Sequence, residues 1–390
     1  MDIVIVSNFG IGIDDRADSR FNYLANMLYE KGHNVEIITC DFFHGKKRYR
    51  TDFGVKLPYK ITFLHQPAYK KNISIKRLFS HYCWGREVNK YLQTRKKPDV
   101  IYCAIPSLTA AAYSAKYCKQ NKIRFIIDIQ DLWPEAFMLA FHIPIISNII
   151  FYPFNRLADY IYSSADSICA VSQTYVDRAL LANKKLTRGT VAFLGKELKS
   201  FDIFASENIV EKPSDELWLG YCGSMSASYN LPAVIDALAM LEKPPKFIAM
   251  GDGEKRKQYE DYAKQKRINA LFTGKLPFDK MCGWIVKCDI VINPITSKSA
   301  ASVINKHADY AASGLPVINT QESPEYRKLV ENRKMGFNCS NSPAEIAEKL
   351  RILIGNPELR KEKGKNARRC AEEMFDRQQS YKSLVQQIVD

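Results

Sequence analysis

The sequence of 390 residues lacks several signals that would assign it to a common class of protein. Its ten cysteines are scattered and none forms a CxxC pair, which favours reduced, buried thiols in a reducing compartment over a disulfide framework or a zinc site. No stretch reaches the roughly eighteen apolar residues of a membrane-spanning helix. The first residues, MDIVIVSNFG, predict a strand and a glycine loop, and they lack the charged start and long apolar run of a signal peptide.

Acidic side chains are scarce in one part of the chain. Residues 42–97 contain 15 Lys and Arg against 2 Asp and Glu, and they hold most of the net charge of +15. This excess predicts an anionic partner, either nucleic acid or an anionic membrane surface, although a solvated basic face without a partner is an alternative. Because no helix-turn-helix, zinc or RNA-binding signature is present, we expect no nucleic-acid partner.

Strand and helix patterns alternate almost throughout, which predicts an α/β protein with mostly parallel sheets covered on both faces. The rhythm breaks at residues 196–216, which are polar and weakly patterned, and then restarts. We therefore expect two Rossmann-like parallel-sheet domains with a cleft between them. The predicted bounds are 1–200 for the N-terminal domain, 201–370 for the C-terminal domain and 371–390 for a tail helix that returns to the N-terminal domain.

One stretch, SVINKHADYAASGLPVIN at residues 302–319, combines a helix, a glycine stop and a buried strand. It places Asn305 and Asp309 on one helix face, with Lys306 beside them. A parallel strand and a small-residue loop precede this helix, and such a helix N-terminus favours a bound phosphate. The alternative is an ordinary surface helix whose Lys306 and Asp309 form an exposed ion pair.

Glycine loops follow several of the predicted strands, and in a two-domain parallel-sheet protein these loops line the cleft. Neither Gly10-x-Gly12 nor Gly251-x-Gly253 is completed to GxGxxG, which disfavours a nicotinamide site. Together with the loops at 223–226 and 274–277, they indicate a phosphate-bearing ligand.

The ordered motifs GYCGSMSASYNL, FIAMGDG, LFTGKLP and NKHADYAASGLPVI resemble those of family 4 glycosyltransferases, which have the GT-B architecture. The DLWPE stretch at 131–135 is similar to that of bacterial surface-polysaccharide enzymes. The resemblance implies that the C-terminal domain binds a nucleotide-sugar, usually UDP-linked, and that the N-terminal domain binds the acceptor. It also implies transfer with retention of the anomeric configuration, a final helix that crosses back, and no cofactor or essential metal.

The resemblance assigns donor-binding roles residue by residue. Asp309 matches the acid that binds the ribose hydroxyls, a role that suits a carboxylate. Lys306 and the amides around Ser302 and Val303 would meet the diphosphate, and Lys306 would stabilise the departing nucleotide. The remaining donor-binding candidates are Asn305, Gly223, Ser224, Gly251, Gly253, Leu276 and Gly12.

Three departures from the family pattern affect these roles. The first of two acids usually spaced by eight is replaced by Ala301, and the usual Arg and Lys after the first strand of the C-terminal domain are replaced at Ser224 and about Tyr229. The family's active-site histidine position falls near Gln130. The polar candidates for acting on the acceptor hydroxyl are therefore Asp128, Asp131 and Glu135. For Asp131 the alternative is a helix cap.

The sequence thus predicts a glycosyltransferase that acts on a lipid-linked saccharide in capsule, O-antigen or exopolysaccharide assembly. The basic segment and the apolar residues 136–154, which Pro144 and Pro153 interrupt, predict a cytoplasmic enzyme bound to the inner face of the membrane, although 136–154 could instead be core and a helix start. Two alternatives from other classes are a non-hydrolysing nucleotide-sugar epimerase, which would need more cleft acids or histidines, and a nucleic-acid-binding protein.

Overall fold

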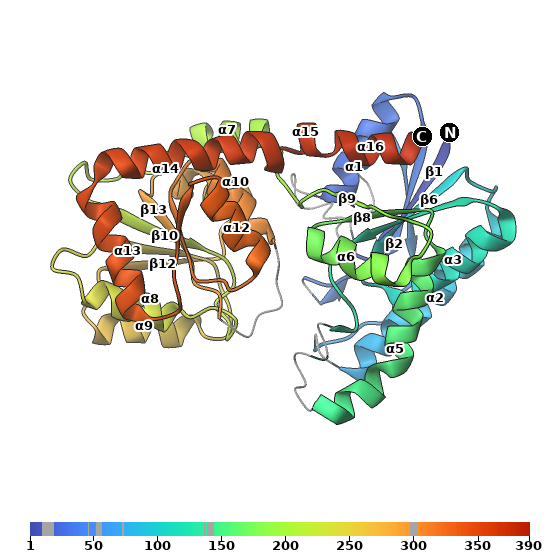
Figure 1. The fold of residues 1–390 in the computed structure, drawn as a ribbon, viewed down its shortest axis with the longest axis horizontal. Coiled ribbons are helices and arrows are strands. Elements are labelled where there is room, and N and C mark those ends of the chain that lie inside the picture. Colours follow the sequence, from blue (N-terminus) through green and yellow to red (C-terminus); the bar gives the residue numbers. More distant parts are fainter. Residues whose placement is uncertain are drawn as a thin grey trace. The chain divides into compact units, whose positions relative to one another are not determined.

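The computed structural model describes residues 1–9, 19–45, 47–51, 57–71, 74–135, 138, 144–296 and 303–390. The chain divides into two compact units (Figure 1): unit 1 comprises Met1–Phe193 and Tyr381–Asp390, and unit 2 comprises Leu194–Ser380. Each unit contains a parallel sheet with helices packed on it, so the predicted α/β class with two Rossmann-like domains is confirmed. The predicted sites at Gly12 and Ser302 lie outside the described residues.

The sheet of unit 1 has seven parallel strands in the order β5-β2-β1-β6-β7-β8-β9. The described elements of unit 1 are β1 (Asp2–Val6), α1 (Arg20–Glu30), β2 (Asn34–Cys40), β3 (Phe42–Phe43), β4 (Arg48–Tyr49), β5 (Lys60–Leu64), α2 (Ile75–Thr94), β6 (Val100–Ile105), α3 (Leu108–Asn121), β7 (Arg124–Ile129), α5 (Pro144–Ser164), β8 (Ser167–Ala170), α6 (Gln173–Ala182), β9 (Thr190–Val191) and α16 (Lys382–Val389). The central strands read as near-continuous apolar runs because helices cover both faces of a doubly wound sheet.

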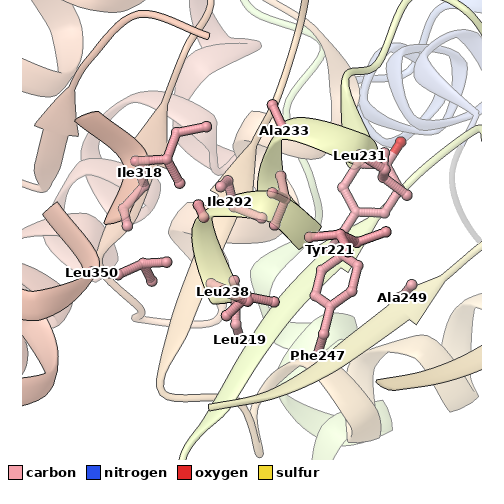
Figure 2. Packing of buried hydrophobic residues seen from close by; sticks show 14 of the residues in the cluster. Leu219, Tyr221, Leu231, Ala233, Leu238, Phe247, Ala249, Ile292, Ile318 and Leu350 are labelled. Atoms are coloured by element: carbon pink, nitrogen blue, oxygen red, sulfur yellow. The ribbon is translucent and has the colours of Figure 1, made fainter. Parts of the chain in front are cut away.

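The sheet of unit 2 has six parallel strands in the order β12-β11-β10-β13-β14-β15. The described elements of unit 2 are α7 (Leu198–Glu207), β10 (Trp218–Cys222), α8 (Leu231–Ala239), β11 (Lys246–Met250), α9 (Arg256–Gln265), β12 (Ala270–Gly274), α10 (Phe278–Ile285), β13 (Ile290–Asn293), α11 (Asn305–Ala312), β14 (Val317–Asn319), α12 (Pro324–Asn332), β15 (Gly336–Asn338), α13 (Pro343–Gly355), α14 (Pro357–Cys370), the π-helix η1 (Ala371–Phe375) and α15 (Arg377–Ser380). Figure 2 shows its core, where side chains of α8 and α13 meet those of β10 and β13.

Three local features differ from the sequence prediction. The expected linker at 196–216 contains the helix α7, because Leu198 and Phe201 are buried and Phe201 contacts Phe278 of α10. Within the basic segment 42–97, the structure has a short antiparallel pair, β3–β4, that the sequence did not predict. The tail is broken by η1 and α15 before α16 packs against α1 in unit 1.

Candidate active site

The carboxyl ends of β10, β11 and β12 meet at one edge of the unit 2 sheet, where a pocket of about 320 Å³ opens. Strand β10 lies between β11 and β13, so the strand order reverses there, and doubly wound sheets bind ligands at such a switch point. The pocket is lined by Cys222, Gly223, Ser224, Met250, Gly251, Asp252, Lys275, Leu276 and Met281. Six of these nine residues belong to the loops that follow the three strands.

Two glycines allow the loops after β10 and β11 to touch. Gly223 and Gly251 both have a φ of +147°, which side chains disfavour, and a Cβ on Gly251 would lie 1.9 Å from the carbonyl oxygen of Gly223. The Gly223 amide donates a hydrogen bond to Met250 O (2.9 Å), and the Gly251 amide donates one to Gly274 O (2.9 Å). The glycines thus let the loops pack closely and form a backbone surface at the pocket.

A buried lysine lies directly behind this surface. Lys306 is 6% exposed, and its Nζ lies 3.7 Å from the ring centre of Tyr229 and 4.5 Å from that of Tyr221. A Cβ on Gly223 would lie 2.7 Å from this nitrogen. Among the residues that the structure describes, Lys306 Nζ has no hydrogen-bond partner. Burying an amine without such a partner is costly.

Burial also controls the charge of this lysine. Loss of hydration lowers the pKa of Lys306 to about 7, although the neighbouring Cys222 and Asp309 raise it in part. Near neutral pH the amine is therefore poised between its two protonation states. An anion bound beside it would favour the protonated form.

The helix α11 holds Lys306 in place through Tyr310 and His307. The Tyr310 hydroxyl donates to Ile292 O (2.9 Å) and accepts from the Cys222 amide (3.0 Å), which ties α11 to β13 and β10. The ring of His307 stacks on Tyr326 with 3.4 Å between ring centres. Burial lowers the pKa of His307 well below its usual value, so this side chain is neutral and structural.

Asp309 lies one turn further along α11 and is also buried. Its Oδ1 lies 3.2 Å from Nζ of Lys196, and the two residues are 6% and 5% exposed. The alternative prediction of an exposed Lys306–Asp309 pair on a surface helix is therefore wrong. A carboxylate can accept several hydrogen bonds, as a ribose site requires.

The structure brings some of the predicted donor residues together and separates others. Gly223, Ser224, Gly251 and Leu276 line the pocket, and Lys306 abuts it through Gly223. Four predicted donor residues do not line it: Asp309 and Val303 are buried, Gly253 packs against Met225 and Asn305 is exposed.

Asp128, one of the three acidic candidates in unit 1, is fully buried and engaged on both oxygens. Arg20 Nε donates to its Oδ2 (2.8 Å) and Arg20 Nη2 to its Oδ1 (3.0 Å). Gln130 Nε2 adds a third bond to Oδ2 (3.2 Å), and Arg20 also donates to the Tyr381 hydroxyl (3.1 Å). This arrangement favours a structural role for Asp128, which joins α1, β7 and the last residues of the chain.

The other two acids are more accessible. Asp131 is half-buried, its Oδ2 accepts a hydrogen bond from Trp133 Nε1 (3.2 Å), and burial raises its pKa. Glu135 forms an ion pair with Arg178 Nε (2.5 Å), and Arg178 also binds Asp159. Of the three candidates, Asp131 is the one without an arginine bonded to its carboxylate in the hydrogen bonds and ion pairs of the described residues.

Unit 1 also contains a pocket, of about 330 Å³, near Asp131. The lining of this pocket is almost entirely apolar. It lies among α2, α3, α5 and Trp133, and it is lined by Leu78, Phe79, His81, Tyr82, Leu108, Thr109, Trp133, Phe154 and Leu157. The guanidinium of Arg77 lies 4.6 Å from the ring centre of Trp133. A cationic group therefore adjoins the aromatic wall of this pocket.

Apolar side chains also project from the helices beside this pocket. Ile75 and Phe79 of α2 are 84% and 59% exposed, and Ile149 of α5 is 71% exposed. Ile150, Tyr152 and Tyr82 are exposed as well. Within the basic segment 42–97, the aromatic residues Phe42, Tyr69 and Trp84 are buried in unit 1 and cannot face a membrane. Among the helices of the described residues, none has the length and apolar character to cross a bilayer.

The fold and the pocket at the switch point define unit 2 as a Rossmann-like domain with a site suited to a phosphate-bearing ligand. Residues 216–356 match the family described as Glycosyl transferases group 1. Over 210 residues the chain is 24% identical to the uncharacterized glycosyltransferase MJ1178 of Methanocaldococcus jannaschii, covering 54% of this chain and 55% of that protein. The chain thus spans about half the length of this curated relative.

Solved structures share the whole fold. Sucrose-phosphate synthase from Thermosynechococcus elongatus superimposes with a TM-score of 0.74 at 14% identity, covering 100% of this chain and 97% of that one. Anabaena HepE in complex with UDP has a TM-score of 0.69 at 16% identity, covering 100% and 98%. These similarities show that the fold is that of the GT-B architecture.

Sequence reasoning missed several residues of the site. Tyr221 and Tyr229 read as ordinary strand and loop aromatics, yet their rings flank the Lys306 ammonium. Lys196 pairs with Asp309, 113 positions away, and no local pattern reports such a long-range contact. One indication of these contacts was present in the sequence. The family's usual basic residue is absent near Tyr229, so another residue has to supply the positive charge at the site.

Proposed function

We propose that this chain is a retaining glycosyltransferase that moves a sugar from a nucleotide-sugar, UDP-linked, to a hydroxyl of a lipid-linked saccharide. The observation that carries the proposal is the buried Lys306 amine held against Gly223 at the pocket in unit 2. The match of residues 216–356 to the glycosyl transferases group 1 family supports the reaction class, and the UDP bound to the similar HepE structure supports the nucleotide.

On the donor side, the diphosphate would lie on the backbone of Gly223 and Gly251, where only hydrogen atoms cover the α-carbons. Lys306 would bind it from behind and neutralise the charge that develops as the bond to the anomeric carbon breaks. Asp309 would accept the ribose hydroxyls, and the loop at Lys275 and Leu276 would hold the base through backbone groups.

On the acceptor side, Asp131 would orient or deprotonate the attacking hydroxyl. Burial raises the pKa of its carboxyl, which makes the carboxylate a stronger base than an exposed aspartate. Its hydrogen bond from Trp133 fixes the orientation of one oxygen, so the other can face an acceptor.

The lipid-linked acceptor and a place at an anionic membrane surface are proposed from unit 1. The exposed Ile75, Phe79 and Ile149 would enter the headgroup region, and the exposed Lys70, Lys71 and Lys76 would bind anionic lipids. The adjoining apolar pocket offers space for the lipid part of the acceptor.

Donor binding is tested by thermal unfolding with a panel of UDP- and GDP-sugars, because a ligand that binds the folded state raises the melting temperature. We expect a UDP-sugar to stabilise the wild-type protein saturably and to stabilise Lys306→Met and Asp309→Asn much less. Analysis of the sugar after incubation separates the reaction classes: transfer to an acceptor supports a glycosyltransferase, and an epimerised nucleotide-sugar would favour the epimerase. No stabilisation by any nucleotide-sugar would refute the proposal.

Membrane binding is tested by flotation with anionic and neutral vesicles at low and high salt. We expect binding to anionic vesicles only, weakened by salt and by charge reversal of Lys70, Lys71 and Lys76. Charge reversal of Lys96 and Lys97 is the matched control, because these exposed residues follow the opposite end of the 20-residue α2, about 30 Å away. Equal loss of binding in both variants would show nonspecific attraction, and absence of binding would favour a soluble acceptor.

A further inference from the structure

Lys196 occupies a site that nothing in its local sequence marks. It is the third residue of unit 2, and its side chain reaches Asp309 on α11. Its Nζ lies 3.2 Å from Asp309 Oδ1 and 4.7 Å from the ring centre of Phe278. Both members of this ion pair are at least nine-tenths buried.

The backbone of Lys196 is fixed independently of this ion pair. Its amide donates to Phe375 O (2.7 Å), and its carbonyl accepts from the Arg377 amide (2.9 Å). Arg377 Nε also donates to Leu194 O (3.0 Å). Because the backbone of Lys196 is fixed and its side chain packs on Phe278, its Nζ is held beside Asp309 before a ligand binds.

We infer that Lys196 is a positioning residue of the donor site, which keeps Asp309 ionised and oriented to accept the hydroxyls of a ribose. The inference rests on the proposed function and deepens its donor site. A carboxylate has about four acceptor positions, and one ammonium uses only part of them. In a buried position an aspartate without a cation would take up a proton and lose half of its capacity to accept.

The other groups around Asp309 do not replace Lys196. Lys306, on the same helix, faces Tyr221 and Tyr229, and burial holds its pKa at about 7. Burial raises the pKa of Cys222 on β10 to about 12, so the thiol is neutral.

The helix α14 also packs on α11, and its Arg368 is engaged elsewhere. Arg368 forms ion pairs with Asp202 and Glu372, and it donates to Ala312 O (3.0 Å). Of Lys196, Lys306 and Arg368, Lys196 is therefore the one that forms an ion pair with Asp309.

The test compares Lys196→Met with Lys196→Arg, which keeps the charge, and with Lys199→Met, which removes an exposed lysine three residues away. Affinity for UDP-glucose is measured between pH 5.5 and 8.5. We expect Lys196→Met to weaken binding at least tenfold at pH 6 and less at pH 8.5, because Asp309 regains its charge as the pH rises. Lys196→Arg should stay within about threefold of wild type, and Lys199→Met should be unchanged. In the Asp309→Asn background, Lys196→Met should add little, because the residue that it positions is already altered.

A ligand-free measurement separates this inference from the proposed function. The Asp309 carboxyl carbon is followed by NMR in protein labelled at aspartate Cγ and is assigned by its loss in Asp309→Asn. We expect its midpoint to rise by at least one pH unit in Lys196→Met, or in Lys196→Gln if the methionine variant fails to fold. An unchanged midpoint, or UDP-glucose affinity that falls equally at every pH, would overturn the inference. Failure of the wild-type protein to bind any nucleotide-sugar would refute the proposed function alone.

Discussion

The side-chain nitrogen of Lys306 lies against the α-carbon of Gly223, so close that a methyl group on the glycine would come within 2.7 Å of it. This contact joins a residue of α11 to the loop backbone at the end of β10. It also explains how a site without the usual basic residues near Ser224 and Tyr229 keeps a cation. The cation comes from α11 and passes between two tyrosine rings to reach the same place.

Replacing Gly223 with alanine should therefore displace Lys306 and distort the loop. The φ of +147° adds backbone strain, and we expect the free energy of unfolding to fall by about 1–3 kcal/mol. Affinity for UDP-glucose should fall at least tenfold, as measured by calorimetry. The control is Gly355→Ala at the end of α13, where a Cβ meets no atom within 4 Å. Wild-type affinity in Gly223→Ala would contradict the role of this contact.

Replacing Lys306 with methionine should stabilise the ligand-free protein while it removes donor binding. The pKa of Lys306 is about 7 in the folded chain and near 10.5 when unfolded, so the unfolded state binds more protons in between. The wild-type protein should thus gain stability relative to Lys306→Met as pH rises from 7 to 9, on the order of 2 kcal/mol. Urea unfolding at the two pH values measures this. If the difference in unfolding free energy between wild type and Lys306→Met is the same at pH 7 and pH 9, Lys306 does not titrate in this range.

Asp128→Asn should destabilise unit 1 strongly. Its partner Arg20 would keep a full charge in the core without the opposing carboxylate, and breaking such a buried pair costs about 3–5 kcal/mol. The expected result is a large fall in melting temperature, with donor affinity retained in whatever fraction stays folded. An Asp128→Asn protein of normal stability but without transferase activity would restore Asp128 as a catalytic candidate.

Asp131→Asn should lower the activity and leave the stability of unit 1 nearly unchanged. The residue is half-buried and bonded to Trp133, so the amide can replace the carboxylate with little change in folding. We expect sugar transfer to fall by about 10²–10⁴-fold, the usual contribution of a general base, while affinity for the donor is unchanged. Steady-state transfer and UDP-glucose titration are measured on the same preparation. Full activity would leave Glu135 as the next candidate, although its pairing with Arg178 argues against it.

The sequence was sufficient for the parts of the molecule that local patterns control. Apolar runs such as those of β1 and β7 predict buried parallel strands, and Gly314 with Leu315 and Pro316 marks the end of α11 before β14. The same patterns located the glycine loops at 223 and 251, because a glycine directly after a buried strand is typical of a tight turn or a close approach of two backbones.

Long-range contacts were beyond this reasoning. The sequence favoured Asp131 and kept Asp128 and Glu135 as further catalytic candidates, and it could not show that Arg20, 108 residues before Asp128, holds Asp128 in the core. Asn305 and Asp309 share a helical spacing, yet one is exposed and the other buried, because neighbouring elements cover only part of α11. The helix α7 was overlooked because its short apolar pattern of Leu198, Phe201 and Phe204 stands in an otherwise polar segment; the structure shows that Phe201 and Phe204 contact Phe278 of α10.

We propose that a nucleotide-sugar binds at the strand ends of unit 2 beside Lys306. Hydrogen–deuterium exchange of the full chain, with and without a saturating UDP-sugar, shows where the ligand binds, because exchange is measured peptide by peptide. We expect slower exchange in the peptides that cover residues 222–226, 250–253, 274–276 and 304–310, and loss of this protection in Lys306→Met. Protection confined to other peptides, or none with any nucleotide-sugar, would rule out binding at this site.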